Sequence, residues 1–211
     1  MFTLAIALSR LGEALWKRVG VEPSGHAFNS ILQLETEASI PRQPFMDASA
    51  LVVTDSILAG HPPGETLSEI LRFVRMSAGD DDIHIKQSVA RTGEETGHLN
   101  RALAHFMTSH GRLKNPVGLT CGTYFHQCAI KMNCLQLARA GQFFMGPFKD
   151  APPLDSAQKI RRINALMMTY GPSDGSEGFA FRVGLPGESG VGGAILVPGP
   201  TRPSSPSARQ A

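Results

Sequence analysis

Residues 179–196, FAFRVGLPGESGVGGAIL, form the stretch of this chain that most limits its possible folds. Apolar residues alternate over Phe179–Val183, a Gly/Pro-rich bend follows, and Val191–Leu196 is apolar again. This pattern predicts two short strands joined by a turn. Five glycines lie within residues 184–193, which suggests that another group approaches the backbone closely. A tight hairpin with a flexible tip explains the same glycines, so both interpretations stay open.

Most of the remaining sequence has apolar residues at helical spacing. Four leucines from Leu4 to Leu15 form one stripe, and Gly20 follows as a helix stop. Neither of the first two residues supplies a cap, so this helix lacks the usual start signal. Further helices are expected at 28–37, 47–58, 66–76, 92–109, 123–140 and 155–170.

Three of these helices carry start signals. Asp47 is a candidate cap for the helix at 47–58, and Asp155 or Ser156 for the helix at 155–170. Thr92 and Glu95 match a capping box and are expected to open the helix that runs to residue 109. The predicted fold class is therefore α+β and mainly helical, with a small sheet at the C-terminal end.

Composition favours a single domain without a nucleic-acid or membrane partner. The chain has 211 residues, 42% of them apolar, and a net charge of +2, which is too even for an electrostatic nucleic-acid or membrane surface. No apolar run reaches the roughly 18–20 residues of a membrane span. Three cysteines without a CxxC pair indicate a reducing compartment and predict a cytoplasmic protein. The Pro/Ser-rich residues 198–211 are predicted to form a disordered tail.

Neither a metal nor another cofactor is expected. His98 and His105 are seven residues apart on one predicted helix, which is not the spacing of a zinc-binding helix, and surface histidines are the simpler reading. A Ser-x-x-Lys sequence occurs at Ser156–Lys159. One helical turn can place a lysine amine near a serine hydroxyl for nucleophilic catalysis. A serine cap followed by a solvated lysine is the competing interpretation.

Five sequence blocks, in order, resemble one known family. They are VEPSGHAFNSILQLE, IPRQPFMDASALVVTD, EETGHLNRALA, TYFHQCAIKMNCLQLA and FAFRVGLPGESGVGG. Together they look like the serine-dependent glutaminases, which hydrolyse L-glutamine to L-glutamate and ammonia. The resemblance implies a fold similar to serine β-lactamases and penicillin-binding proteins, here as a partial domain over residues 1–197. It also implies L-glutamine as ligand and a possible homo-oligomer.

The resemblance assigns roles to several residues of this chain. In the family a serine attacks the side-chain amide of glutamine, and a lysine one turn later and a tyrosine manage the proton. Asn100 matches a substrate-binding asparagine and Tyr124 a substrate-contacting tyrosine. Val191 matches a position whose backbone N–H contributes to the oxyanion hole, where N–H groups stabilise the tetrahedral state.

Four positions depart from the family pattern. Asp47 replaces an asparagine, and an ionised aspartate accepts hydrogen bonds but donates none. Gly93 stands at the position of a glutamate that holds the substrate ammonium, although Glu94 is adjacent. Ser173 replaces a tyrosine, and Glu188 replaces a lysine, which reverses a charge at the site.

By the same resemblance, the family's catalytic Ser-x-x-Lys would immediately precede Phe2, so none of these 211 residues is assigned as nucleophile. The family pattern also stops near Val197, and the domain is therefore expected to be truncated at both ends. The first expectation is therefore a glutaminase-family protein that is impaired or inactive. A non-catalytic relative that binds an amino acid or a partner subunit is the alternative.

Overall fold

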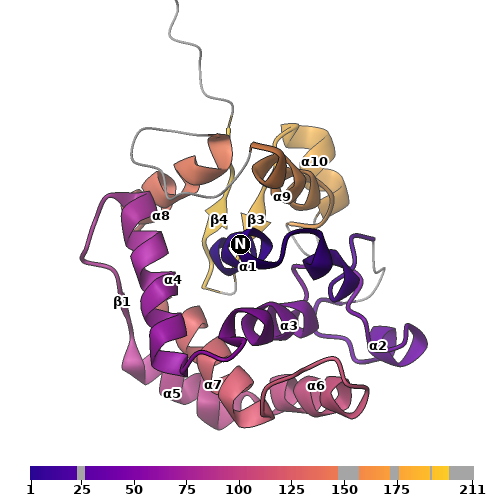
Figure 1. The fold of residues 1–211 in the computed structure, drawn as a ribbon. Coiled ribbons are helices and arrows are strands. Elements are labelled where there is room, and N and C mark those ends of the chain that lie inside the picture. The colour runs from indigo at the N-terminus through magenta and orange to yellow at the C-terminus, as the bar shows by residue number, and fades with distance from the viewer. Residues whose placement is uncertain (23–26, 147–156, 172–175, 191, 200–211) are drawn as a thin grey trace, which may run out of the picture.

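The structure is a computed structural model that describes residues 1–22, 27–146, 157–171, 176–190 and 192–199 (Figure 1). Over these residues it is mainly helical, with two antiparallel pairs of short strands. The helices are α1 (Phe2–Leu11), α2 (Leu32–Thr36), α3 (Asp47–Leu58), α4 (Pro63–Ala78), α5 (Gln87–Thr96), α6 (His98–Ser109), α7 (Val117–Cys128), α8 (Cys134–Gly141), α9 (Ala157–Tyr170) and α10 (Ser176–Val183), with 3-10 helices η1 (Gly12–Lys17) and η2 (Gln142–Met145). The strands are β1 (His84–Ile85), β2 (Ile130–Lys131), β3 (Glu188–Ser189) and β4 (Ile195–Leu196).

Helix α1 lies in the middle of the molecule and packs against α3, α4 and α9 (Figure 1). All residues from Leu4 to Leu8 are buried, so this helix is covered on more than the one side that the predicted apolar stripe implies. The helix also ends earlier than predicted, because Gly12 adopts φ 54° and the chain continues as η1. An α1 buried on several sides needs no polar face, which accounts for its near-continuous apolar sequence.

Helix α3 has the predicted bounds and is buried along almost its whole length. The expected cap is wrong in detail: Met46 holds the N-cap position, and Asp47 is the first helical residue without a side-chain capping bond. Its backbone N–H donates instead to the carbonyl of Phe28, 3.0 Å away. Phe28 belongs to a turn before α2, so the helix predicted at 28–37 is shorter than expected.

The predicted helix at 92–109 is wrong, because the chain forms α5 and α6 with a break at Gly97. Thr92 and Glu95 lie inside α5, and the Thr92 hydroxyl donates to the carbonyl of Ser88 rather than capping a helix. A Cβ added at Gly97 would lie 2.3 Å from Cζ of Phe125 on α7. This close approach of α7 explains why a residue without a side chain stands at the break.

The predicted helix at 123–140 is likewise two helices, α7 and α8, separated by β2. Strand β2 pairs with β1 in the register His84 to Lys131. Helix α8 then begins at a capping box: the Asn133 side chain accepts from the N–H of Gln136, and the Gln136 side chain accepts from the N–H of Asn133. The capping residues thus restart a helix that the apolar periodicity alone does not divide.

The C-terminal hairpin exists, but its predicted first strand is wrong, because Phe179–Val183 belongs to helix α10. Strand β3 pairs with β4 in the register Glu188 to Leu196, and Gly193, at φ 84°, donates from its N–H to Gly190 in the turn. A Cβ at Gly187 would lie 2.6 Å from the Phe179 ring. These described glycines therefore serve turn formation and internal packing.

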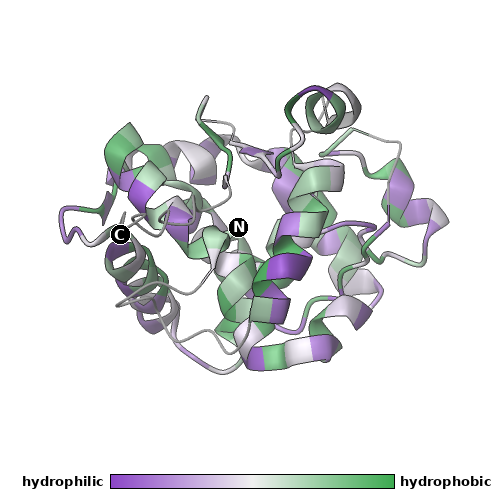
Figure 2. Ribbon diagram, turned by 90° about the horizontal axis from the view of Figure 1, so that it is seen from above, coloured by the Kyte–Doolittle hydropathy of each residue, from purple (hydrophilic) through white to green (hydrophobic). Residues whose placement is uncertain are grey.

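Most helices carry hydrophilic and hydrophobic positions on different sides (Figure 2). The apolar sides meet in one core that spans α1, α3, α4, α7, η2 and α9. Within the part of the chain that the structure describes, no helix is long and apolar enough to cross a membrane. Helix α9 confirms the body of the helix predicted at 155–170, whereas its candidate caps Asp155 and Ser156 lie outside the described residues.

Candidate active site

A cavity of about 560 Å³ opens where the beginnings of α1 and α3 meet the end of α7 and strand β3. It is lined mainly by apolar side chains, with a few polar groups among them, as is common in sites for small ligands. The lining residues are Met1, Phe2, Thr3, Phe28, Pro44, Phe45, Met46, Asp47, Ala50, Ile70, Val74, Tyr124, Gln127, Cys128, Ile130, Met132, Glu188 and Ser189.

Three predicted site residues from three helices meet beside this cavity. Asp47 at the start of α3 accepts a hydrogen bond from Nδ2 of Asn100 on α6 at 3.2 Å. Its other carboxylate oxygen accepts from the hydroxyl of Tyr124 on α7 at 3.5 Å. Asp47 and Tyr124 line the cavity itself. Asn100 does not line it and is linked to it by the hydrogen bond to Asp47.

Burial controls the protonation of this group. It raises the pKa of Asp47, and the hydrogen bonds from Asn100 and Tyr124 oppose that rise by stabilising the carboxylate. Burial also raises the pKa of the Tyr124 phenol, and the negative charge of Asp47 adds to this effect. Tyr124 therefore remains a protonated donor at neutral pH.

Glu188 reaches the same cavity from β3. Burial raises its pKa to about 8, which the positive charge of the Met1 amino group opposes. Its Oε2 atom is buried and has no hydrogen-bond partner among the residues that the structure describes. A buried oxygen without a donor is poorly stabilised as a carboxylate, which agrees with the raised pKa of Glu188.

The sequence gives no direct indication of Gln127 and Cys128 as cavity residues, yet both line it from α7. Helical spacing is the sequence signal that could have indicated Cys128, because this residue lies one turn after Tyr124 and therefore on the same side of α7. Gln127 donates from Nε2 to the hydroxyl oxygen of Thr54 at 2.9 Å, and its buried Oε1 accepts no hydrogen bond from the described part of the chain.

The other predicted site residues are not brought to the cavity by described contacts. Gly93 lies in α5, where an added Cβ would be 3.2 Å from Phe125, and it is not among the lining residues. Val191, Ser173 and Ser156 lie outside the described residues. Lys159 belongs to α9, and α9 contributes no lining residue to the cavity.

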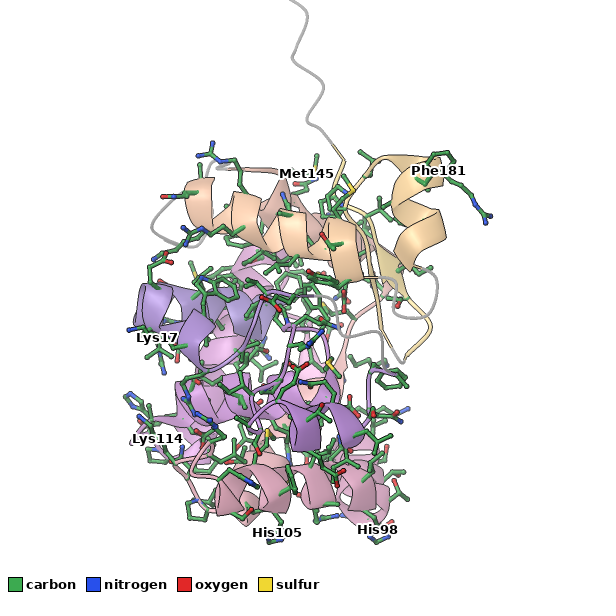
Figure 3. All side chains as sticks on the ribbon, turned by 90° about the vertical axis from the view of Figure 1, so that its right-hand side faces the viewer. Lys17, His98, His105, Lys114, Met145 and Phe181 are labelled. Atoms are coloured by element: carbon green, nitrogen blue, oxygen red, sulfur yellow. The ribbon has the colours of Figure 1, made fainter. Side chains whose placement is uncertain are left out.

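The two histidines considered as metal ligands are exposed on α6, at the outer edge of the molecule (Figure 3). Among the residues described, no group of three or more His, Cys, Asp or Glu side chains is placed to hold a metal ion.

The fold is that of the serine β-lactamase-like glutaminases. The structure superposes on the probable glutaminase ybaS with a TM-score of 0.85 and 32% identity, over 93% of this chain and 64% of that one. For a probable glutaminase of Bacillus subtilis the TM-score is 0.83 and the identity 30%, with the same coverage of the two chains.

The chain belongs to the glutaminase family, whose sequence model matches residues 1–204. It is 55% identical over 207 residues to glutaminases of Azorhizobium caulinodans and of Rhodopseudomonas palustris strain TIE-1. Each of these alignments covers 97% of this chain and 67% of the relative. The chain thus spans about two thirds of the length of the relatives that it matches.

Proposed function

We propose that the cavity binds L-glutamine and belongs to the active site of a glutaminase, which hydrolyses the side-chain amide to L-glutamate and ammonia. The observation that supports this most directly is the meeting of Asn100 and Tyr124 at Asp47 beside the cavity. Both residues match substrate-contacting positions of the family, although they come from different helices and are distant from Asp47 in sequence.

In this proposal each residue of the group has a defined task. Tyr124 is a protonated phenol at the cavity wall, and its single O–H, which donates to Asp47 over a long 3.5 Å, can turn to an oxygen of the substrate. Asn100 keeps Asp47 in place, so it orients the wall through Asp47. The N–H of Val191 would stabilise the oxyanion that forms when the amide carbon becomes tetrahedral, because preorganised donors act on charge that develops in the transition state.

We further propose that these 211 residues, by themselves, bind glutamine without hydrolysing it at an appreciable rate. Of their Ser-x-x-Lys at 156–159, Lys159 belongs to α9, and α9 lines no part of the described cavity. Loss of the nucleophile from a site of this kind leaves only the weaker catalysis of its electrostatic groups. Binding of a partner subunit, including a second copy of this chain, is the alternative role, and the three free cysteines fit a cytoplasmic location.

The test is glutamate release from L-glutamine by the purified chain, together with glutamine-dependent thermal stabilisation. We expect stabilisation without turnover, and Tyr124→Phe should weaken the stabilisation because it removes the donor. Ser156→Ala is the matched control and should change neither result. Turnover that Ser156→Ala abolishes would contradict the proposal, and so would the absence of any effect of glutamine on the melting temperature.

A further inference from the structure

The cavity beside Asp47 is larger than free glutamine needs. Its volume is about 560 Å³. Sites that enclose most of a drug-sized ligand have volumes of about 300–1,000 Å³. Glutamine, with only about ten non-hydrogen atoms, is smaller than such a ligand and would leave part of the cavity unfilled. What that part can hold depends on how polar and apolar groups divide the cavity wall.

The polar groups of the wall follow one direction along α7. Tyr124, which donates to Asp47, stands one helical turn before Cys128 on the same side of the helix. The Met1 amino group lies near both Cys128 and Glu188 of β3, since burial lowers its pKa and these two groups oppose that effect. The polar wall therefore runs from the start of α3 along α7 to β3. The other polar lining residues lie on α1, α7 and β3 and are Thr3, Gln127 and Ser189.

Beyond Cys128 the wall becomes apolar. Strand β2 follows α7 and contributes Ile130, and Met132 comes directly after the strand. Helix α4, which packs against both α1 and α7, contributes Ile70 and Val74, one turn apart. Both lie in the interior of α4, where the backbone groups bond within the helix. These last four side chains form the apolar pocket of the cavity, which offers contact area and no side-chain donor.

The apolar pocket keeps surface that a ligand can cover. Ile130 and Met132 line the cavity and are only partly buried, although they pack against the core. Removing apolar surface of this kind from water is favourable in proportion to its area. The unbranched side chain of Met132 can also adapt to the shape of a ligand. A polar group would lose its hydration here without gaining a partner, so the pocket favours an apolar one.

We propose that the apolar pocket is a second subsite, which binds an apolar substituent on the side-chain amide nitrogen of glutamine, so that such N-alkyl derivatives bind more tightly than glutamine itself. The inference rests on the proposed function, because it assumes that the amino-acid end of glutamine lies beside Asp47 and Tyr124. The side chain then extends along α7 toward Cys128. A substituent on its amide nitrogen continues in the same direction and enters the apolar pocket.

The experiment is isothermal titration of the full chain with L-glutamine, its N-butyl side-chain amide and its N-hydroxypropyl side-chain amide. The two derivatives have equally many non-hydrogen atoms, and a terminal hydroxyl replaces a methyl group in the second. One fully buried CH₂ group corresponds to about fourfold in affinity, or about 0.8 kcal/mol. We expect the butyl derivative to bind at least about tenfold more tightly than L-glutamine, and the hydroxypropyl derivative to lose most of this gain. The butyl derivative should also give the more negative heat-capacity change.

A substitution in the apolar pocket tests where the butyl group lies. Met132→Gln keeps the length of the side chain but makes its end polar, and should reduce the preference for the butyl derivative over L-glutamine by at least about threefold. Leu135→Gln is the matched control and should leave this preference unchanged, because Leu135 is exposed on α8 and is not among the described lining residues. If Met132→Gln does not fold, as judged by near-UV circular dichroism, the comparison of the two derivatives decides.

The outcomes separate this inference from the proposed function. If L-glutamine binds and the butyl derivative binds equally or more weakly, the second subsite does not exist and the proposed function stands. Equal gains for the butyl and hydroxypropyl derivatives would likewise overturn the inference, since an apolar pocket must distinguish them. An equal preference in Met132→Gln and Leu135→Gln would show that the butyl group lies elsewhere. Binding of none of the three compounds would overturn both proposals.

Discussion

Asp55 in α3 is a carboxylate with no solvent exposure that holds several segments together. It pairs with the guanidinium of Arg18 at 2.6 Å and accepts from the backbone N–H groups of Lys114 and Asn115 at 2.8–3.1 Å. These partners lie before α2 and between α6 and α7. The buried carboxylate therefore has a cationic partner and several hydrogen-bond donors, which is the condition under which a buried ion can be tolerated.

We expect Asp55→Ala to lower the free energy of unfolding by about 3–5 kcal/mol, because it removes the buried carboxylate that pairs with Arg18 and accepts from the backbone N–H groups of Lys114 and Asn115. Glu69→Ala is the control: it removes an ion pair with Arg10 in which both side chains are about 30% exposed, and should cost less than about 1 kcal/mol. Urea unfolding followed by circular dichroism measures both. Equal losses in the two variants would contradict the assigned role of Asp55.

Glu188 should give the protein a measurable pH dependence. Burial raises its pKa from 4.5 to about 8. Between these values the folded state holds a proton that the unfolded chain has lost, so the free energy of unfolding falls as the pH rises through this window. Asp47 titrates in both the wild type and a Glu188 variant, so its contribution cancels in a comparison, whereas the Met1 amino group interacts with Glu188 and its contribution is part of the measured difference.

Glu188→Gln should accordingly flatten the profile. We expect its loss of melting temperature between about pH 5 and about pH 8 to be smaller than that of the wild type by at least about 2–4 °C, which corresponds to about 1 kcal/mol for a protein of this size. Differential scanning fluorimetry across this range provides the measurement. Parallel profiles would show that Glu188 titrates near its ordinary pKa.

Among single residues, those that match positions with a known role in the family could be predicted from the sequence. Those whose role depends on a contact between helices could not. Asp47, Asn100 and Tyr124 were named from such matches, and the structure places them in contact. Gln127 was not named, because its unpaired oxygen follows from the orientation that Thr54 imposes, and that contact joins α3 to α7. The roles of Val191 and Ser173 stay predictions, since both lie outside the described residues.

At the scale of the element, the contact between α5 and α7 depends on glycine. Gly97→Ala would place a Cβ 2.3 Å from Phe125 and 2.6 Å from the Gly93 carbonyl, and we expect a loss of about 1–3 kcal/mol in the free energy of unfolding. Gly122→Ala in α7 meets nothing within 4 Å and should stabilise the protein by about 0.5–1 kcal/mol through helix propensity. Chemical denaturation that ranks the two variants in the opposite order would refute this packing.

Helix bodies were more predictable than helix ends and the C-terminal elements. Helix α3 has its predicted bounds, and α4 extends the predicted 66–76 at both ends, where Pro63 at its first position and Gly79 in the left-handed conformation after it are readable signals. Phe179–Val183 alternates as a strand would, yet forms α10, which packs against α9. Tertiary packing outweighs a period-2 pattern in so short a segment.

At the scale of the whole molecule, an aromatic cluster joins the N-terminal helix to distant segments. The ring centroids of Phe2 and Phe144 are 5.4 Å apart, Phe144 and Phe143 are 5.1 Å apart, and Phe143 and Phe73 are 5.2 Å apart. These rings come from α1, η2 and α4. Phe144 is fully buried, so its ring fills the space where these three elements meet.

We expect Phe144→Ala to lower the free energy of unfolding by about 3–5 kcal/mol, because it removes a large buried ring and leaves a cavity. Phe181→Ala makes the same chemical change on α10 at a side chain that is 91% exposed, and should alter the free energy by less than about 0.5 kcal/mol. Thermal unfolding monitored by circular dichroism tests the pair. A small effect of Phe144→Ala would mean that this cluster does not join the elements.

The class of the whole fold was predictable, because a mainly helical pattern and five ordered blocks extend over most of the chain. The central position of α1 was not, since an apolar stripe does not reveal how many neighbours a helix has. The predicted boundary between a domain at 1–197 and a tail at 198–211 stays a prediction, because residues 200–211 lie outside the described part of the chain.

The central α1 has a consequence for biosynthesis. Its apolar surface is synthesised well before α9, which covers part of it, and the ion pair between Glu13 and Arg162, just beyond α1, spans 149 positions. Such non-local closure is slow, and at about 5–20 residues per second the nascent chain exposes this surface for many seconds. The protein should therefore depend on a chaperone that shields α1 until translation has passed α9.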